Sequence, residues 1–256
     1  MARRISLMNH KGGVGKTSAS VNLAVCFAQR GHRTLLVDLD PQANASQFLG
    51  LAQRIADPGV YGSGELMAGG APFGPHRSHL HPNLDLIPAT QALLEIERQL
   101  ALDHERNLRR LRQAVTEVEA QYDFVVVDCP PTLGFLPTSA AMACPEVIVP
   151  VRLAPASLPG ALRMRAHLED LRVAREPSIR VLGVLGTYYS EVARTPREIH
   201  FALKAIFGGG LFRTVIHQSQ TVEDAAGRGL PTVLLDPRSR AAAEYQQLTQ
   251  EVIDRA

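Results

Sequence analysis

The fold class of this 256-residue chain follows from one stretch, Lys11-Gly12-Gly13-Val14-Gly15-Lys16-Thr17-Ser18. It comes after the short apolar run Ile5–Met8 and opens a helix predicted over Lys16–Arg30, which is the setting that a phosphate-binding loop requires. The glycines let backbone N–H groups surround phosphate oxygens, Lys16 can reach the β- and γ-phosphates, and the Thr17 hydroxyl suits Mg²⁺. A plain Gly-rich turn is the alternative, but Gly-Lys-Thr in register favours the phosphate-binding loop.

Short apolar runs alternate with longer helical patterns along the chain. Several runs are apolar on both faces, as expected of parallel strands that helices cover on each side. The predicted strands are Ile5–Met8, Thr34–Asp38, Leu84–Ile87, Phe124–Asp128, Val147–Val151, Val181–Tyr188 and Phe212–Ile216. The predicted helices are Lys16–Arg30, Gln91–Ala120, Ser157–Arg175, Pro196–Phe207 and Ser239–Arg255. This alternation indicates an α/β fold with a doubly wound, mostly parallel sheet flanked by helices, in a single domain over residues 1–256.

Two stretches interrupt this alternation. Residues from Asp57 to Pro82 are rich in Gly, Pro and His, which predicts a surface excursion with one short helix around Gly64–Ala68. The run Gly208–Gly210 predicts a second loop between a helix and a strand.

The composition is that of an ordinary globular protein, with 45% hydrophobic and 20% charged residues. Its formal net charge of +2 gives no bulk signal for nucleic acid, so a DNA-binding surface would need local clustering of cations. Cys26, Cys129 and Cys144 form no CxxC pair, which argues against a disulfide framework or a zinc site. We see neither a signal peptide nor an apolar run of roughly 20 residues, and we expect a cytoplasmic protein.

Two of the predicted strands end in carboxylates. Leu35–Gln42 reads LLVDLDPQ and carries Asp38 and Asp40, and Phe124–Pro131 reads FVVVDCPP and carries Asp128. The carboxyl edge of an open α/β sheet is where ligands bind. An isolated Asp could instead cap a helix. Carboxylates at strand ends, in this order after a phosphate-binding loop, favour a site for nucleotide and Mg²⁺.

The loop departs from the usual pattern at its start, where His10 replaces the first glycine and Lys11 follows. This early lysine resembles the deviant Walker A loop of one ATPase group, which includes ParA, MinD, the nitrogenase iron protein and the arsenite pump ATPase. The resemblance implies an ATP-sandwich homodimer in which Lys11 contacts the nucleotide of the partner subunit. There the lysine would stabilise charge on the transferred phosphoryl group, much as an arginine finger does. The alternative is a solvated loop lysine.

The same resemblance implies roles for the other residues of the site, with ATP and Mg²⁺ as cofactors. Asp40, the second Asp of the Asp-x-Asp-Pro-Gln motif, would position or activate the attacking water. The residues supporting Mg²⁺ would be Thr17, Asp38 and Asp128. The catalytic residues would be Lys11, Lys16 and Asp40. The nucleotide phosphates would be bound by Lys11, Gly12, Gly13, Val14, Gly15, Lys16, Thr17 and Ser18.

The resemblance to short ParA-type partition ATPases covers nearly the whole chain. It includes Asn44–Gly50, Leu84–Thr90 and Asp236–Ser239, and the last two are not needed for generic ATP binding. It implies an ATP-bound dimer that binds double-stranded DNA without sequence preference, through basic residues late in the chain. The candidates are Arg194, which matches a family DNA-contacting position, and Arg197, Lys204, Arg213, Arg228, Arg238 and Arg240. Scattered, solvated cations are the alternative.

One stretch departs from this family. Where many ParA proteins read Ile-Pro-Arg-Asn-Val-Arg, this chain reads Ile216-His217-Gln218-Ser219-Gln220-Thr221, so both arginines are missing. His217 and Ser219 take the places of the Pro and Asn that often flank the adenine base. We therefore take these two residues as the candidate base contacts.

The end of the chain argues against a membrane-binding relative. MinD ends in a basic amphipathic helix, whereas the last residues here carry Glu244, Glu251 and Asp254 against Arg255. Anionic lipid repels such a face, so we expect a solvated helix that packs on the domain and no membrane partner. The lack of paired cysteines likewise disfavours a metal-cluster carrier.

The sequence thus favours a ParA-type ATPase that hydrolyses ATP to ADP and phosphate on the nucleoid. The resemblance implies that it drives chromosome or plasmid partition and that a ParB-like protein stimulates hydrolysis. A MinD-like positioning ATPase that acts on another matrix or cargo is the main alternative. A DNA scaffold that needs no turnover is a further one.

Overall fold

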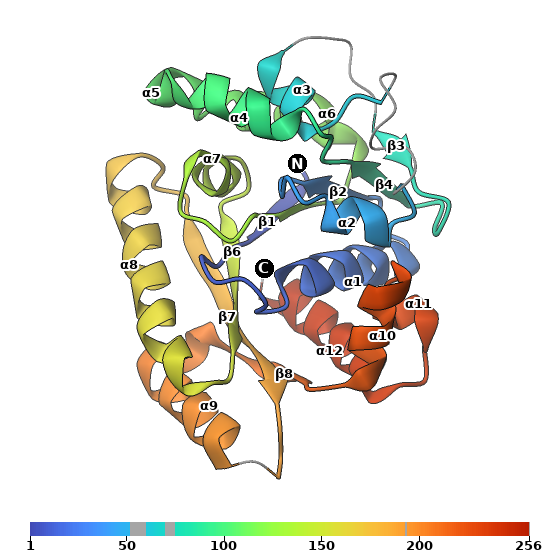
Figure 1. Ribbon diagram of the computed structural model, residues 1–256, viewed down its shortest axis with the longest axis vertical. Coiled ribbons are helices and arrows are strands. Elements are labelled where there is room, and N and C mark those ends of the chain that lie inside the picture. The colour runs from blue at the N-terminus through green and yellow to red at the C-terminus, as the bar shows by residue number, and fades with distance from the viewer. Residues whose placement is uncertain (52–59, 70–74, 193, 256) are drawn as a thin grey trace.

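The computed structural model describes residues 1–51, 60–69, 75–192 and 194–255. In these residues an eight-stranded sheet lies between two layers of helices (Figure 1). The strands are β1 (Arg3–Leu7), β2 (Thr34–Asp38), β3 (His76–Arg77), β4 (Leu84–Ile87), β5 (Phe124–Asp128), β6 (Glu146–Arg152), β7 (Arg180–Tyr189) and β8 (Leu211–His217). Their order is β3-β4-β2-β5-β1-β6-β7-β8, and each neighbouring pair is parallel except β3–β4. The predicted α/β fold is confirmed.

The central strands are buried on both faces, as their apolar runs predict. In β2, Leu35 and Val37 belong to one hydrophobic cluster and Leu36 belongs to the other. Successive side chains of a strand point to opposite faces, so a parallel strand between two helix layers needs apolar residues at every position.

Two sets of helices cover the two faces of the sheet (Figure 1). One face carries α1 (Lys16–Gln29), α2 (Asn44–Phe48), α10 (Gln220–Arg228), α11 (Thr232–Leu235) and α12 (Arg240–Asp254). The other carries α3 (Ser63–Ala68), α4 (Leu93–Ala101), α5 (His104–Asn107), α6 (Arg110–Val118), α7 (Phe135–Ala143), α8 (Leu158–Ala174) and α9 (Arg194–Phe207). Among the residues described, no helix combines the length and apolar character that crossing a membrane would require.

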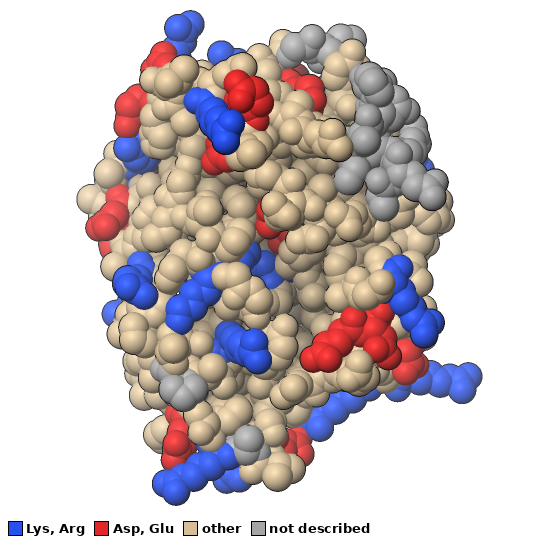
Figure 2. All heavy atoms as spheres, in the orientation of Figure 1, with Lys and Arg blue, Asp and Glu red and all other residues tan. Residues whose placement is uncertain are grey.

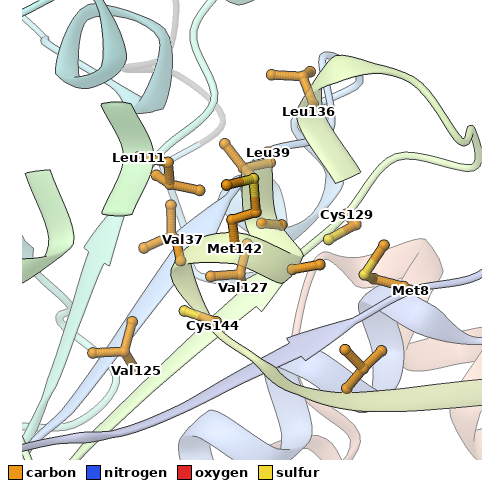
Figure 3. Close-up of a cluster of buried hydrophobic side chains, with 14 of the residues drawn as sticks. Met8, Val37, Leu39, Leu111, Val125, Val127, Cys129, Leu136, Met142 and Cys144 are labelled. Carbon is orange, nitrogen blue, oxygen red and sulfur yellow. The ribbon is translucent and has the colours of Figure 1, made fainter. Parts of the chain in front are cut away.

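Figure 3 shows the cluster between α7 and the strands, where Met142 lies close to Leu39, Val37 and Val127. Every residue of α7 is buried, so this helix has no polar face. The sequence analysis did not identify α7, because its evenly apolar residues lack the periodicity that marks a half-exposed helix.

The predicted long helix over Gln91–Ala120 is wrong. The chain forms α4, α5, α6 and a 3₁₀ turn (Glu119–Gln121) there instead. Between α4 and α5 the backbone of Asp103 leaves the helical region, with φ −119° and ψ 66°. The break lets Leu100 and Leu111 both turn into the core.

The remaining differences lie at ends and turns. Helix α9 starts at Arg194, two residues before the predicted start, and Pro196 is tolerated there because the first turn of a helix needs no N–H partner. Gly208–Gly210 forms a 3₁₀ turn rather than an irregular loop. Within the predicted excursion, α3 confirms the short helix and β3 adds a strand, while residues 57–59 and 70–74 lie outside the described residues.

Candidate functional site

The phosphate-loop residues lie between β1 and α1, at the carboxyl edge of the sheet. Gly13 and Gly15 have φ of 66° and 81°, values that favour glycine and turn the backbone back on itself before α1 starts at Lys16. Two residues that the sequence analysis missed hold this loop. The Asn9 side chain accepts from Lys11 N (3.0 Å) and donates to the Pro150 carbonyl (2.7 Å). These contacts fix the entry of the loop to β6.

The other holding residue comes from β7. The Thr187 hydroxyl donates to the Val14 carbonyl over 3.0 Å, and its side chain lies 3.6 Å from the place where a Cβ on Gly15 would stand. A hydroxyl on a distant strand carries no local sequence signal, and this explains why the pattern around the loop did not point to it. The loop is thus braced from β6, through Asn9, and from β7, through Thr187.

The side chain of Lys16 curls into the loop. Its Nζ donates to the Lys11 carbonyl over 3.1 Å, and the residue is only 6% exposed. Burial lowers the pKa of this ammonium, while the charges of Asp128 and Asp40 oppose that shift. The cation therefore points into the space that the loop encloses, where a phosphate would meet it.

Lys11 lies elsewhere. Its Nζ donates to the Ala156 carbonyl, in the 3₁₀ turn (Pro155–Ser157) before α8. A Cβ added to Gly160 of α8 would come within 3.1 Å of Lys11 Cε, so the missing side chain makes room for the lysine. In this single chain, Lys11 is bound to its own α8 segment, not directed into the loop.

Asp38 and Asp128 stand side by side, because β2 and β5 pair in register at these two residues. Both are fully buried. Burial, and then the charge of Asp128, raises the pKa of Asp38 to about 7. Burial also raises the pKa of Asp128 to about 6, and the hydroxyls of Thr17 and Ser20 oppose that shift.

The two carboxylates differ in what they bind. Asp38 accepts from Ser46 N (2.8 Å), Ser46 Oγ (2.7 Å) and Asp40 N (3.0 Å), so both of its oxygens are used. Asp128 accepts from Ser20 Oγ over 2.9 Å through Oδ1. Its buried Oδ2 has no hydrogen-bond partner among the described residues. Such an oxygen fits the coordination shell of a hard cation.

Asp40 follows β2 and is 7% exposed. Its Oδ1 accepts from Gln42 N over 3.0 Å, a local turn that leads into α2. The structure therefore gathers Lys16, Asp38, Asp40 and Asp128 at one edge of the sheet, where the sequence analysis expected them.

His217 and Ser219 line a narrow hollow together with Gly15 and Ser18 of the loop region and Tyr188 of β7. The structure thus brings the two candidate base contacts next to the phosphate loop. The free volume is about 30 Å³. Small-molecule sites usually measure about 300 Å³ or more. This hollow is too narrow for a base as it stands, but His217 and Ser219 also line a wider one of about 370 Å³ on the side of Tyr189 and Glu244.

The ring of His217 has a defined role in hydrogen bonding. Its Nδ1 lies 2.6 Å from Glu244 Oε1, and its Nε2 lies 2.7 Å from Arg240 Nη2. An ionised carboxylate can only accept, so Nδ1 donates to Glu244, while Nε2 faces both the Arg240 guanidinium and Glu191 Oε1, the latter at 3.3 Å. The backbone N of His217 also donates to Glu244 Oε2 over 2.9 Å.

Glu244 and Glu251 of α12 are not solvated, which corrects the expectation for the C-terminal helix. Each is 6% exposed. Glu251 accepts from the backbone N of Arg213 (2.9 Å) and Thr214 (3.0 Å) in β8. Burial favours a higher pKa for Glu251, but these backbone donors and others outweigh it, and the pKa is lowered. The acids face a sheet edge, which helical periodicity alone cannot reveal.

The candidate DNA-binding cations do not form one group. Arg194, Arg197 and Lys204 are exposed on α9, whereas Arg240 pairs with Glu191 and Glu244. Arg194 pairs with Glu198 over 2.7 Å. The others lie apart, on β8 (Arg213), at the end of α10 (Arg228) and before α12 (Arg238). Figure 2 shows Lys and Arg side chains at separate places on this face and at its lower end, where Figure 1 places α9.

The chain matches known proteins over its whole length. The family model described as an AAA domain matches residues 2–181. The chain is 34% identical over 253 residues to the sporulation initiation inhibitor protein Soj of Bacillus subtilis, covering 98% of each chain. It is 37% identical to the chromosome-partitioning ATPase Soj of Thermus thermophilus, covering 99% of this chain and 96% of that one. The septum site-determining protein MinD of Pyrococcus horikoshii, complexed with Mg-ADP, has a similar fold, with a TM-score of 0.78, 24% identity and coverage of 98% and 96%.

Proposed function

Because this chain belongs to the ParA/MinD-type P-loop ATPases, we propose that it is a partition ATPase which forms an ATP-dependent homodimer and binds double-stranded DNA. ATP and Mg²⁺ are its cofactors. The observation that carries the proposal is the buried Lys16 ammonium inside the loop, near Asp128 with its unpaired Oδ2. Together they supply a cation for phosphate oxygens and an oxygen ligand for a metal.

The residues around the phosphates divide the work between them. Bound Mg²⁺ would neutralise charge on the β- and γ-phosphates. The Thr17 hydroxyl and Asp128 would hold it, while the loop N–H groups around Gly13 and Gly15 bind phosphate oxygens. Asp38 would act indirectly, because its oxygens hold Ser46 and the backbone of Asp40.

Hydrolysis would depend on Asp40 and Lys11. Asp40 would orient the attacking water towards the γ-phosphate. Lys11 would leave the Ala156 carbonyl and reach the nucleotide of the partner subunit, adding a positive charge where negative charge develops. Dimer formation would then complete a site that each subunit holds only in part.

The remaining assignments concern the base, the DNA and the partner. His217 and Ser219 would contact the adenine base. The exposed cations of α9 would contribute most to DNA binding, because Arg240 is already paired with two carboxylates. The Soj relatives support a role in chromosome or plasmid partition on the nucleoid, with a ParB-like protein that stimulates hydrolysis.

ATP affinity tests the site. Lys16→Ala should abolish ATP binding, because it removes the charge at the centre of the loop. Lys204→Ala on α9 is the matched control and should bind ATP as the native protein does. Isothermal titration with a slowly hydrolysed ATP analogue and Mg²⁺ measures both, and native affinity in Lys16→Ala would refute the site.

DNA binding tests the function. We expect salt-sensitive binding to random duplex DNA with ATP, and none with ADP or without nucleotide, in a fluorescence anisotropy assay. Asp40→Ala should keep ATP-dependent DNA binding but lose hydrolysis. A native protein that binds ATP but no DNA in any state would refute the partition role.

A further inference from the structure

The outer face of α9 carries a row of cations with one aromatic residue among them. Arg194, Arg197, Phe201 and Lys204 follow one another at spacings of three, four and three residues, which places them on one side of a helix. The other side of the helix is anchored in the core by Ile199 and Leu203. We call these four residues the α9 row.

Phe201 is exposed to an unusual degree for a large apolar side chain. It is 74% exposed, and in the described part of the chain its ring meets neither another ring nor a stacked cation. Beside it is a surface hollow of about 760 Å³, whose walls include Val192, Arg194, Arg197 and His200. Val192 is itself 95% exposed. Single exposed apolar residues are common. Phe201 differs from them because it lies between cations and next to a hollow.

The charge and the size of this surface favour one class of partner. Within α9, the three cations of the row stand against one acid, Glu198, which pairs with Arg194. Membrane insertion needs a continuous apolar face, and among the residues described at this surface the prominent apolar ones are Phe201 and Val192. Duplex DNA presents phosphates on either side of less polar sugar and base edges, which matches an apolar side chain flanked by cations.

We propose that Phe201 makes a non-ionic contact to duplex DNA. The cations on either side of it in the α9 row would bind phosphates on either side of that contact. This inference rests on the proposed function, since it assigns a further residue to the same DNA surface. The inference adds one property to the proposed function: part of the affinity for DNA would not depend on the release of counterions from the phosphates. Arg197 and Phe201, one helical turn apart, would then respond differently to salt.

The experiment compares these two residues in the full-length protein with ATP and Mg²⁺. Binding to a random duplex is measured by anisotropy between about 50 and about 200 mM salt. Phe201→Ala should weaken binding about tenfold at each salt concentration and leave the salt slope unchanged. Arg197→Ala should weaken binding and reduce the slope by about one unit. Phe201→Trp should bind as the native protein does.

Val173→Ala is the matched control, because Val173 is an exposed apolar residue (72%) on α8, outside the row. It should bind DNA normally, and all variants should bind ATP normally and keep the native melting temperature. Native affinity in Phe201→Ala would overturn the inference, as would a reduced salt slope. Loss of binding to anionic vesicles, with DNA binding intact, would also overturn it and assign Phe201 to a membrane. Failure of the native protein to bind DNA would instead refute the proposed function.

Discussion

Two pairs of buried carboxylates meet the same sheet at different places and with different hydrogen-bond partners. Asp38 and Asp128 end the central strands β2 and β5, while Glu244 and Glu251 reach from α12 to the edge strand β8. Burial raises the pKa of the Asp pair, to about 7 and about 6. The pKa of Glu251 is lowered, because backbone N–H groups compensate for its burial.

The difference separates a carboxylate that stabilises the fold from one that is available to a ligand. Each Glu meets backbone donors that no strand pairs with, so its negative charge is compensated within the protein. Asp128 keeps an oxygen without a partner among the described residues, which costs folding free energy until something binds it. Burial alone therefore does not identify an acid that is open to a ligand. An oxygen without a hydrogen-bond partner does, and by this criterion Asp38, whose two oxygens are both bound, resembles the structural acids more than Asp128 does.

The largest effect should come from Asp128→Asn. We expect ATP hydrolysis to fall by about 100-fold or more, because one metal-binding charge is lost. The free energy of unfolding should stay about the same, because the unfavourable burial of a charge and its favourable contacts with Ser20 and Lys16 are removed together. Phosphate release and urea unfolding measure these quantities. Asp170→Asn, at an exposed position of α8, is the control, and a clear loss of stability in Asp128→Asn would contradict the comparison.

Glu251→Ala should act in the opposite way. It leaves the backbone N–H groups of Arg213 and Thr214 without acceptors, so the free energy of unfolding should fall by about 2–4 kcal/mol. ATP affinity should not change. Asp254→Ala, on an exposed part of the same helix, serves as the control and should alter stability by no more than about 0.5 kcal/mol. Equal stability of the two variants would show that the acid does not cap the strand.

The pH dependence of the unfolding free energy should also identify Glu251 as a carboxylate that stabilises the fold. The pKa of Glu251 is lower in the folded protein than its ordinary value of 4.5. Its contribution is therefore complete above that value and is lost as the pH falls through the folded pKa. The difference in unfolding free energy between the native protein and Glu251→Gln should narrow when urea unfolding is repeated from pH 6 downwards. A constant difference below pH 4 would contradict this assignment.

The smallest effect should come from Glu191, at the exposed end of the network that links it to Arg240, His217 and Glu244. Glu191 pairs with Arg240, but its side chain is 62% exposed, so water screens the pair. Glu191→Gln should shift the melting temperature by less than about 1 °C in differential scanning fluorimetry. Glu244→Gln, at the buried end of the same network, should lower it by several degrees. Similar shifts in both variants would mean that burial does not decide the strength of these contacts.

Much of the fold could be predicted from apolar runs, because parallel strands between helix layers need apolar residues at every position. Thr34–Asp38, Leu84–Ile87 and Phe124–Asp128 have the predicted bounds. Elements without such a pattern were missed. These elements are β3, which has only two residues, and α7, which is buried on every side.

The candidate site was predictable where one segment carries the chemistry. The phosphate loop and the acids after β2 and β5 each show a local pattern. Asn9 and Thr187 brace the loop across strands that are far apart in the sequence, and no local pattern marks them. The acids of α12 resemble those of an exposed helix until the strand opposite is known. These contacts join residues that only the folded topology brings together, so local sequence patterns could not predict them.

The state of the sheet's two edge strands affects how copies of the protein can associate when they lie close together. At one end β3 spans two residues, and at the other β8 has backbone donors that Glu244 and Glu251 already bind. In the described part of the chain, neither end offers a long run of free backbone groups to a strand from another molecule. If copies gather along DNA as we propose, they can be neighbours without joining their sheets into fibres, and their assembly would remain reversible.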